Sequence, residues 1–200
     1  MLSAALADFK ADSGVVVLAI PRGGVFVARE VARALGLELD IIVTRKIGAP
    51  GDPELAVGAV TQEGEIVVDR RLADLLQVSE RYVKAEASKE LEEIERRVKV
   101  YRGTRPRLEI AGKTVIIVDD GIATGSTMKA AAMSARTMKA SNVVIAAPVA
   151  SPEAVRELSE FSDKIVCLSV PEGMVAIGEF YDTFEQADDV AVRRTLEEGD

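Results

Sequence analysis

Val115-Ile-Ile-Val-Asp-Asp-Gly-Ile-Ala-Thr-Gly-Ser-Thr127 is the stretch that decides the fold, because it passes from apolar to acidic to small residues without interruption. Four consecutive branched apolar residues are typical of a strand covered on both faces, as in a parallel sheet. Ligands of such sheets gather beyond the carboxyl ends of the strands. The small, hydroxyl-rich residues after the two acids precede a predicted helix over residues 126–139, and a helix N-terminus favours phosphate. The stretch therefore predicts a buried strand that opens onto a phosphate site.

The adjacent carboxylates of Asp119 and Asp120 are the least expected part of this stretch. An ordinary strand-to-helix turn with a good N-cap is the structural alternative. Side-by-side carboxylates repel each other, however, and a plain turn has no need of them. The pair therefore argues against an ordinary turn.

Composition limits the class of protein. The chain has 200 residues, 48% of them apolar, which predicts a single domain. It shows no long apolar run and no signal peptide, so we expect a cytoplasmic protein that does not enter the membrane. The formal charge of −8 argues against nucleic acid as the main partner. Histidine is absent, so any metal would be a hard cation held by oxygen, such as magnesium.

Strand-like and helix-like segments alternate along the chain. Strands are predicted over residues 15–20, 39–44, 57–61, 65–69, 115–118, 142–148 and 165–170, and helices over 25–35, 71–101, 126–139 and from 151 onward. The strand over 65–69 pairs with the strand over 57–61 as a hairpin around Gly64. The helical segment over 71–101 is either one long helix or a broken one. Residues 47–54 are too rich in Gly and Pro to be regular. This alternation predicts an α/β fold, a doubly wound parallel sheet with helices on both faces.

Cationic residues follow the first two predicted strands. Pro21-Arg22-Gly23-Gly24 places a guanidinium beside two glycines, which lets the backbone and the charge approach a pyrophosphate together. A tight turn with a solvated arginine is the alternative. Arg45 and Lys46 sit where the second strand ends and could neutralise a pyrophosphate, although solvated charges are the commoner outcome for such a pair.

Residues 115–127 resemble the phosphoribosyl pyrophosphate (PRPP) signature of the type I phosphoribosyltransferases at every position. The loop at residues 21–24 is similar to the pyrophosphate loop of that family, which often holds a non-proline cis peptide; Pro21–Arg22 is the matching bond. The tail over residues 175–184 looks like the hood of the purine-specific members. Val175 departs from that pattern by replacing an aromatic residue that stacks on the base, whereas Asp182 matches an aspartate that approaches the metal.

The resemblance implies a role for each matching residue. Asp119 and Asp120 would engage the ribose and, with Asp182, magnesium; Arg45 and Lys46 would assist catalysis at the leaving pyrophosphate. The groups that would bind PRPP are Arg22, Gly23, Gly24, Ala123, Thr124, Gly125, Ser126 and Thr127. A mobile catalytic loop would fall within residues 71–107, most of all at 103–107.

The function implied is that of a magnesium-dependent glycosyltransferase of nucleotide metabolism, which exchanges the pyrophosphate of PRPP for a nitrogenous base or another amine. The alternatives are a PRPP-sensing regulatory protein that binds nucleic acid and a dinucleotide-binding enzyme, although Gly-x-Gly-x-x-Gly is absent after residues 15–20. We expect one domain over residues 1–200, with a core at about 14–170 and a hood at about 171–200 joined by an N-terminal arm. The nucleophile and the oligomeric state, a homo-oligomer included, are left open.

Overall fold

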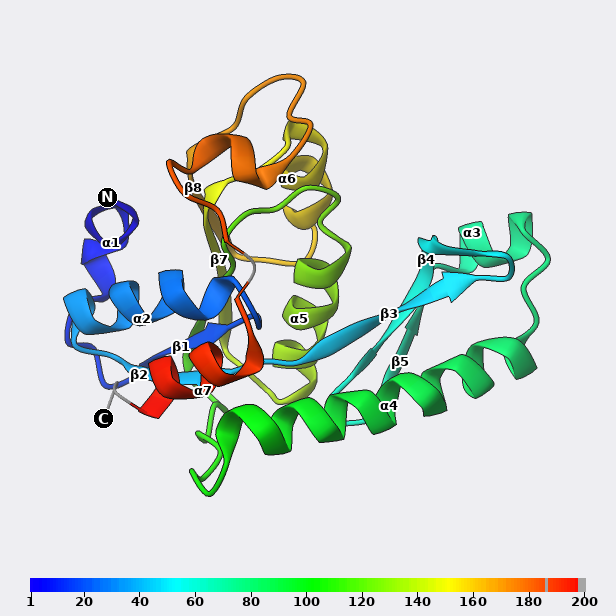
Figure 1. Ribbon diagram of the computed structural model, residues 1–200, viewed down its shortest axis with the longest axis horizontal. Coiled ribbons are helices and arrows are strands. Elements are labelled where there is room, and N and C mark those ends of the chain that lie inside the picture. Colours follow the sequence, from blue (N-terminus) through cyan, green and yellow to red (C-terminus); the bar gives the residue numbers. More distant parts are fainter. Residues whose placement is uncertain (186, 198–200) are drawn as a thin grey trace.

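The computed structural model describes residues 1–185 and 187–197 and is built on a five-stranded parallel sheet (Figure 1). The strand order is β2-β1-β6-β7-β8, and each neighbouring pair is parallel. The strands are β1 (Val15–Ala19), β2 (Glu38–Ile41), β6 (Thr114–Val118), β7 (Asn142–Val149) and β8 (Lys164–Ser169). The predicted parallel sheet is confirmed.

Helices cover both faces of this sheet because the central strands are apolar on both sides. Along β1, Val15, Val17 and Ala19 belong to one apolar cluster, and Val16 and Leu18 belong to the other. The first cluster is completed by α1 (Leu2–Ala5), α2 (Gly24–Leu35), α4 (Glu80–Arg102) and α7 (Asp189–Glu197), and the second by α5 (Ser126–Thr137) and α6 (Pro152–Leu158). A short 3₁₀ turn, η1 (Ala7–Phe9), follows α1. The predicted double winding is thereby confirmed.

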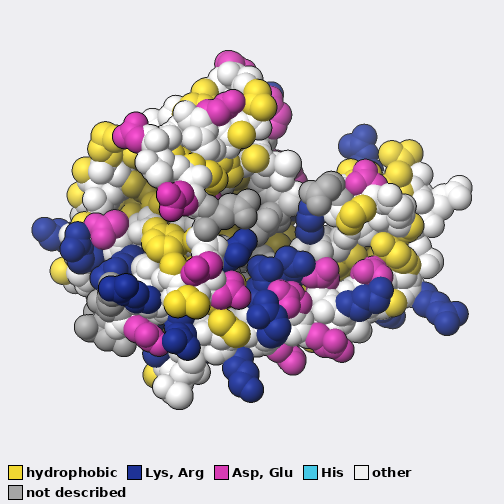
Figure 2. Space-filling view, in the orientation of Figure 1, with side chains coloured by type: hydrophobic (Ala, Val, Ile, Leu, Met, Phe, Trp, Pro, Cys, Tyr) yellow, Lys and Arg dark blue, Asp and Glu magenta, His cyan; other side chains and the backbone are white. Residues whose placement is uncertain are grey.

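A second, antiparallel sheet leaves the core as an arm, which was not predicted. It consists of β3 (Thr44–Ala49), β4 (Asp52–Thr61) and β5 (Ile66–Val68), with α3 (Arg70–Leu75) and the long α4 beside it. Figure 1 shows these cyan and green elements reaching away from the parallel sheet. In the same orientation, Figure 2 shows a notch in the surface between core and arm.

Two predictions fail in and beside this arm. The run over residues 39–44 is not one strand, since β2 ends at Ile41 and β3 starts in a different sheet at Thr44. Residues 47–54 are not irregular throughout but form the end of β3, the turn and the start of β4 in the β3–β4 hairpin. Glycine makes this pairing tolerable: a Cβ on Gly48 would lie 2.6 Å from Pro53 Cα, and the register shifts at Gly48 absorb the irregularity.

The sequence correctly predicts the β4–β5 hairpin and the helical segment that follows it. The hairpin around Gly64 is confirmed, since β4 and β5 pair and Gly64 has a φ of 80°. The helix predicted over residues 71–101 is broken into α3 and α4. Asp69 Oδ1 caps α3 by accepting from Leu72 N at 3.0 Å, and Ser79 Oγ caps α4 by accepting from Tyr82 N at 3.2 Å.

The segment over residues 103–107, which we expect to be the most mobile, follows α4 directly. Its Arg105 donates hydrogen bonds to Leu196 O at 3.0 Å and to Leu39 O at 3.4 Å. Just before it, Arg102 Nε forms a 3.0 Å ion pair with the buried Asp40. These contacts connect the end of α4 to the core, and the mobility of the segment stays a prediction.

The region expected to form the hood begins after β8 and contains η2 (Ile177–Phe180). Figure 1 shows this orange segment above the carboxyl ends of the parallel strands, with α7 returning to lie near α2 and α4. Residues 186 and 198–200, also assigned to the hood, lie outside the described residues. None of the described helices is long and apolar enough to cross a membrane.

Candidate active site

The candidate phosphate loop follows β6 and is fixed to the neighbouring strand β7 and to the residues after it. Ile122 N donates to Val149 O at 2.9 Å, and the Ser151 hydroxyl donates to Ala123 O at 2.6 Å. Gly125 then adopts the left-handed conformation, with a φ of 79°, at the start of α5. Because a side chain disfavours this conformation, glycine suits this corner. The loop is therefore held at the sheet edge where a ligand of β6 would lie.

Donor groups converge within this loop. Thr124 Oγ1 and Ser126 Oγ lie 3.1 Å apart, and Ser126 N donates to Thr124 Oγ1 at 3.4 Å. The first N–H groups of α5 have no partner within the helix, and the helix dipole adds positive potential at the same place. Residues 119–128 line a hollow of about 190 Å³ here, with Ile177 of η2 at its side. A phosphate could accept hydrogen bonds at this helix start.

The two acids stand at the other end of the same hollow. Asp120 N donates to Asp119 Oδ1 at 2.9 Å, which fixes one carboxylate against the backbone of the next residue. Burial raises the pKa of Asp119 well above its usual range, and the neighbouring charge of Asp120 adds to the shift. Burial also raises the pKa of Asp120. Ionised carboxylates are thus costly in the ligand-free site, so a nearby positive charge would be strongly favoured.

The glycine loop is pressed against these acids, although about a hundred residues separate them in the sequence. A Cβ on Gly23 would lie 1.8 Å from Asp120 Oδ2, and a Cβ on Gly24 would lie 2.8 Å from Asp119 Cα. The contact arises because β1 and β6 are neighbours in the sheet, so their following loops meet. The Pro21–Arg22 peptide bond is cis, at the position that the resemblance indicated.

The hood contributes two residues that sequence reasoning missed. Tyr181 donates its hydroxyl hydrogen bond to the backbone oxygen of Asp120 at 2.5 Å. Burial raises the pKa of Tyr181 to about 12, and the charges of Asp120 and Asp119 add to the shift. Ile177 packs where a Cβ on Gly121 would lie, 2.5 Å from its nearest side-chain atom. The cluster of aromatic residues in the tail was the only sequence signal for this contact.

Other predicted site residues are less closely gathered. Arg45 Nε forms a 2.5 Å ion pair with Glu90 of α4. Successive residues of a strand point to opposite faces, so Lys46 shares the face of Thr44, whose hydroxyl contacts Thr127 O at 3.4 Å. Asp182 is exposed and does not line the hollow of about 430 Å³ that Tyr181 and Asp120 share. Val175 is 84% exposed.

The donor set fits a hard cation only in part. Within residues 1–185 and 187–197, no group of three or more acidic or cysteine side chains is arranged to hold a metal ion. Asp119 and Asp120 nevertheless offer adjacent oxygen ligands, which magnesium prefers. Magnesium commonly takes one or two protein carboxylates and completes its shell with water and substrate oxygens, so the residues present fit such a shared site.

A parallel sheet, a candidate phosphate loop and an acid pair beside a glycine loop are features of a phosphoribosyltransferase-type fold. The sequence matches the phosphoribosyl transferase domain family over residues 2–178, and the chain belongs to that family.

Similar proteins support this membership. Two relatives from Mycobacterium tuberculosis, "Putative phosphoribosyl transferase Rv0571c" and "Putative phosphoribosyl transferase MT0597", are each 41% identical over 175 residues, which are 88% of this chain. The chain spans 40% of the length of these relatives. The crystal structure of TT1426 from Thermus thermophilus is 42% identical, with a TM-score of 0.86 over 98% of this chain and 93% of that one.

Proposed function

We propose that the chain is a magnesium-dependent transferase that replaces the pyrophosphate at C1′ of PRPP with a nitrogenous nucleophile. The observation that carries the proposal is the contact between Gly23 and the carboxylate of Asp120. It brings the candidate pyrophosphate loop to the acid pair, and the phosphate loop begins directly after those acids. The three parts of PRPP, namely its 5-phosphate, ribose and pyrophosphate, thus have adjoining places.

Each loop has one task in this proposal. The 5-phosphate binds the residues from Ala123 to Thr127 at the start of α5, and the pyrophosphate binds Arg22 and the backbone of Gly23 and Gly24. The ribose lies over the acid pair between them. Lys46 supplies positive charge from the face of β3 that is turned toward the start of α5. Arg45 forms a 2.5 Å ion pair with Glu90, so Arg45 assists Lys46 only if it leaves Glu90 to contact the ligand.

The acids act on the charge that develops during the reaction. Departure of pyrophosphate makes the ribose ring positive, as in glycoside cleavage. Because burial raises the pKa of both aspartates, their ionised forms have most to gain from that positive ring. Magnesium, held by Asp119 and Asp120, would supply charge neutralisation of the pyrophosphate and ribose oxygens. Asp182 contributes only if the hood rearranges when the ligand binds.

The decisive experiment is pyrophosphate release from PRPP across a panel of purines, pyrimidines and simple amines, with magnesium present. Release that depends on one class of nucleophile would support transfer and would identify the acceptor. The matched control is the double variant Asp119→Asn and Asp120→Asn, which keeps shape but removes charge. If PRPP does not bind the parent protein, or if the double variant is fully active, the proposed mechanism is wrong.

We further propose that the protein acts in nucleotide metabolism in the cytoplasm. The regulatory alternative, a PRPP sensor that binds nucleic acid, requires a basic surface. On the face drawn in Figure 2, Lys and Arg side chains are interspersed with Asp and Glu, and the whole chain carries −8. Retention on heparin that falls steeply with salt would favour that alternative over transfer.

A further inference from the structure

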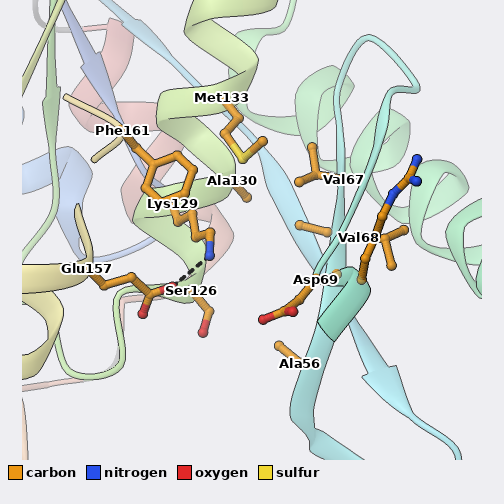
Figure 3. A pocket seen from close by; sticks show the side chains of 13 residues that line it. Ala56, Val67, Val68, Asp69, Ser126, Lys129, Ala130, Met133, Glu157 and Phe161 are labelled. Carbon is orange, nitrogen blue, oxygen red and sulfur yellow. Dashed lines mark hydrogen bonds and ion pairs between the residues drawn. The ribbon is translucent and has the colours of Figure 1, made fainter. Parts of the chain in front are cut away.

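A wedge-shaped cleft of about 410 Å³ separates α5 from the antiparallel arm (Figure 3). One wall is the first half of α5 together with Glu157 and Phe161, and the other is formed by β4, β5 and Asp69 at the start of α3. The proposed PRPP site lies across the start of α5 from it. None of the groups assigned above to the ribose or the pyrophosphate lines this cleft.

The cleft lies between two places where the arm meets α5, and at the start of the helix the hydroxyl of Thr44 contacts Thr127 O at 3.4 Å. At the far end of α5, the hydroxyl of Ser134 donates to Glu63 at 2.6 Å, and Thr137 donates to Glu65. Toward the start of α5, the facing side chains of Ala130 and Ala56 are too small to fill the gap. The arm therefore contacts α5 near both ends and leaves the cleft open beside Ser126, Lys129 and Ala130.

One side of the cleft suits a flat aromatic ring. Phe161 and Met133 form an apolar surface, with Val67 on the opposite wall (Figure 3). Lys129 Nζ lies 4.7 Å from the centre of the Phe161 ring and forms a 2.7 Å ion pair with Glu157. The lysine is thereby held against the wall, and an aromatic ligand could stack beside it.

The polar groups of the cleft select the ring's substituents. In Figure 3, Asp69 points from the arm toward Ser126 and Glu157. Asp69 Oδ1 accepts the capping hydrogen bond from Leu72 N, while its Oδ2 has no hydrogen-bond partner in the described part of the chain. Ionised carboxylates only accept hydrogen bonds. A ring that carries an amino group is therefore better matched than one that carries an oxo group at the same position.

Ser126 connects this cleft to the phosphate loop, because it lines both the cleft and the smaller hollow beside the acid pair. We propose that the cleft binds the base of an amino-bearing nucleotide whose phosphate occupies the loop at the start of α5. Such a nucleotide takes the place of the 5-phosphate of PRPP and acts as a competitive effector. The inference rests on the proposed function in its assignment of the phosphate loop.

The test compares three probes by calorimetry in the absence of PRPP: CMP, UMP and ribose 5-phosphate. CMP should bind roughly fivefold or more tightly than ribose 5-phosphate, the lower end of what stacking one base on an aromatic side chain contributes. CMP should also bind more tightly than UMP, because only cytosine carries the amino group. Ribose 5-phosphate should displace CMP, since both place a phosphate in the same loop.

Variants locate the ring. Phe161→Leu and Ala56→Phe should each reduce CMP affinity to that of ribose 5-phosphate, the first by removing the stacking surface and the second by filling the cleft. Ala85→Phe, at an exposed site on α4 outside the cleft, is the matched control and should leave CMP affinity unchanged. Asp69→Asn keeps an N-cap and should abolish the preference for CMP over UMP.

Three results would overturn the inference: CMP that binds no more tightly than ribose 5-phosphate, CMP that ribose 5-phosphate does not displace, and CMP affinity that both cleft variants leave unchanged. The last result would place the base elsewhere, for instance under the hood. If PRPP binds the parent protein while CMP fails these tests, only this inference is wrong. Failure of PRPP itself to bind would instead count against the proposed function.

Discussion

Replacing Gly23 with alanine should separate catalysis from folding, because the new methyl group would meet a movable side chain. Its Cβ would lie 1.8 Å from Asp120 Oδ2, whereas ordinary contacts begin near 3.4 Å, so the carboxylate must retreat by about 1.6 Å. The backbone of Gly23 is helical, with φ −58° and ψ −41°, so alanine causes no strain of its own. The variant therefore isolates the position of Asp120, one of the two proposed catalytic carboxylates.

A displacement of about 1 Å can cost on the order of 100-fold in rate, so kcat/KM for pyrophosphate release should fall about 100-fold in Gly23→Ala. Stability should change little. Alanine restricts the unfolded chain and gains about 0.4–1 kcal/mol, which offsets the cost of moving Asp120. At this chain length the Tm should stay within about 3 °C of the parent.

Gly24→Ala is the matched contrast, because its Cβ would meet backbone atoms. Val118 O and Asp119 Cα would both lie 2.8 Å away, and neither can rotate aside. Overpacking of this kind costs about 1–3 kcal/mol and should lower the Tm by about 2–12 °C. Differential scanning calorimetry of both variants, alone and with PRPP, measures this difference.

A double-mutant cycle tests the cause directly. In an Asp120→Ala background the carboxylate is gone, so Gly23→Ala should have no further effect on PRPP binding and should stabilise the protein by the unfolded-chain gain of about 0.4–1 kcal/mol alone. If Gly23→Ala costs the same with and without the Asp120 side chain, the steric reasoning is refuted.

The acid pair and the two loops allow three further predictions. Because burial raises the pKa of Asp119 and Asp120, the stability that these groups contribute is present below about pH 4 and is lost as pH rises through their folded pKa values. The double Asn variant should therefore have a higher ligand-free Tm than the parent at pH 7. If this difference in Tm does not shrink as the pH is lowered toward 4, the prediction is wrong. Gly125→Val forces a branched side chain into a φ of 79° and should abolish PRPP binding in calorimetry, whereas unchanged affinity would remove the loop from the site. Arg22→Ala should weaken inhibition by pyrophosphate far more than inhibition by ribose 5-phosphate; equal effects on both would assign the loop another role.

The sequence by itself determined the parallel sheet and the position of the candidate phosphate loop. Both depend on local order along the chain: four branched apolar residues require burial on both faces, and the glycine and hydroxyl residues after Asp120 favour a helix start that can bind phosphate. The helix caps at Asp69 and Ser79 are local in the same sense. Such features can be read from the sequence because their partners lie within a few residues.

Only the tertiary structure decided how distant segments meet. The contact of Gly23 with Asp120 requires β1 and β6 to be neighbours, and the bond from Tyr181 to Asp120 O joins residues 61 positions apart. Nothing in the sequence indicated that residues 44–68 leave the main sheet as an arm, because the choice of pairing partner for a strand depends on long-range packing. The acid pair and the phosphate loop were therefore predictable, whereas the hood contact and the cleft beside α5 were not.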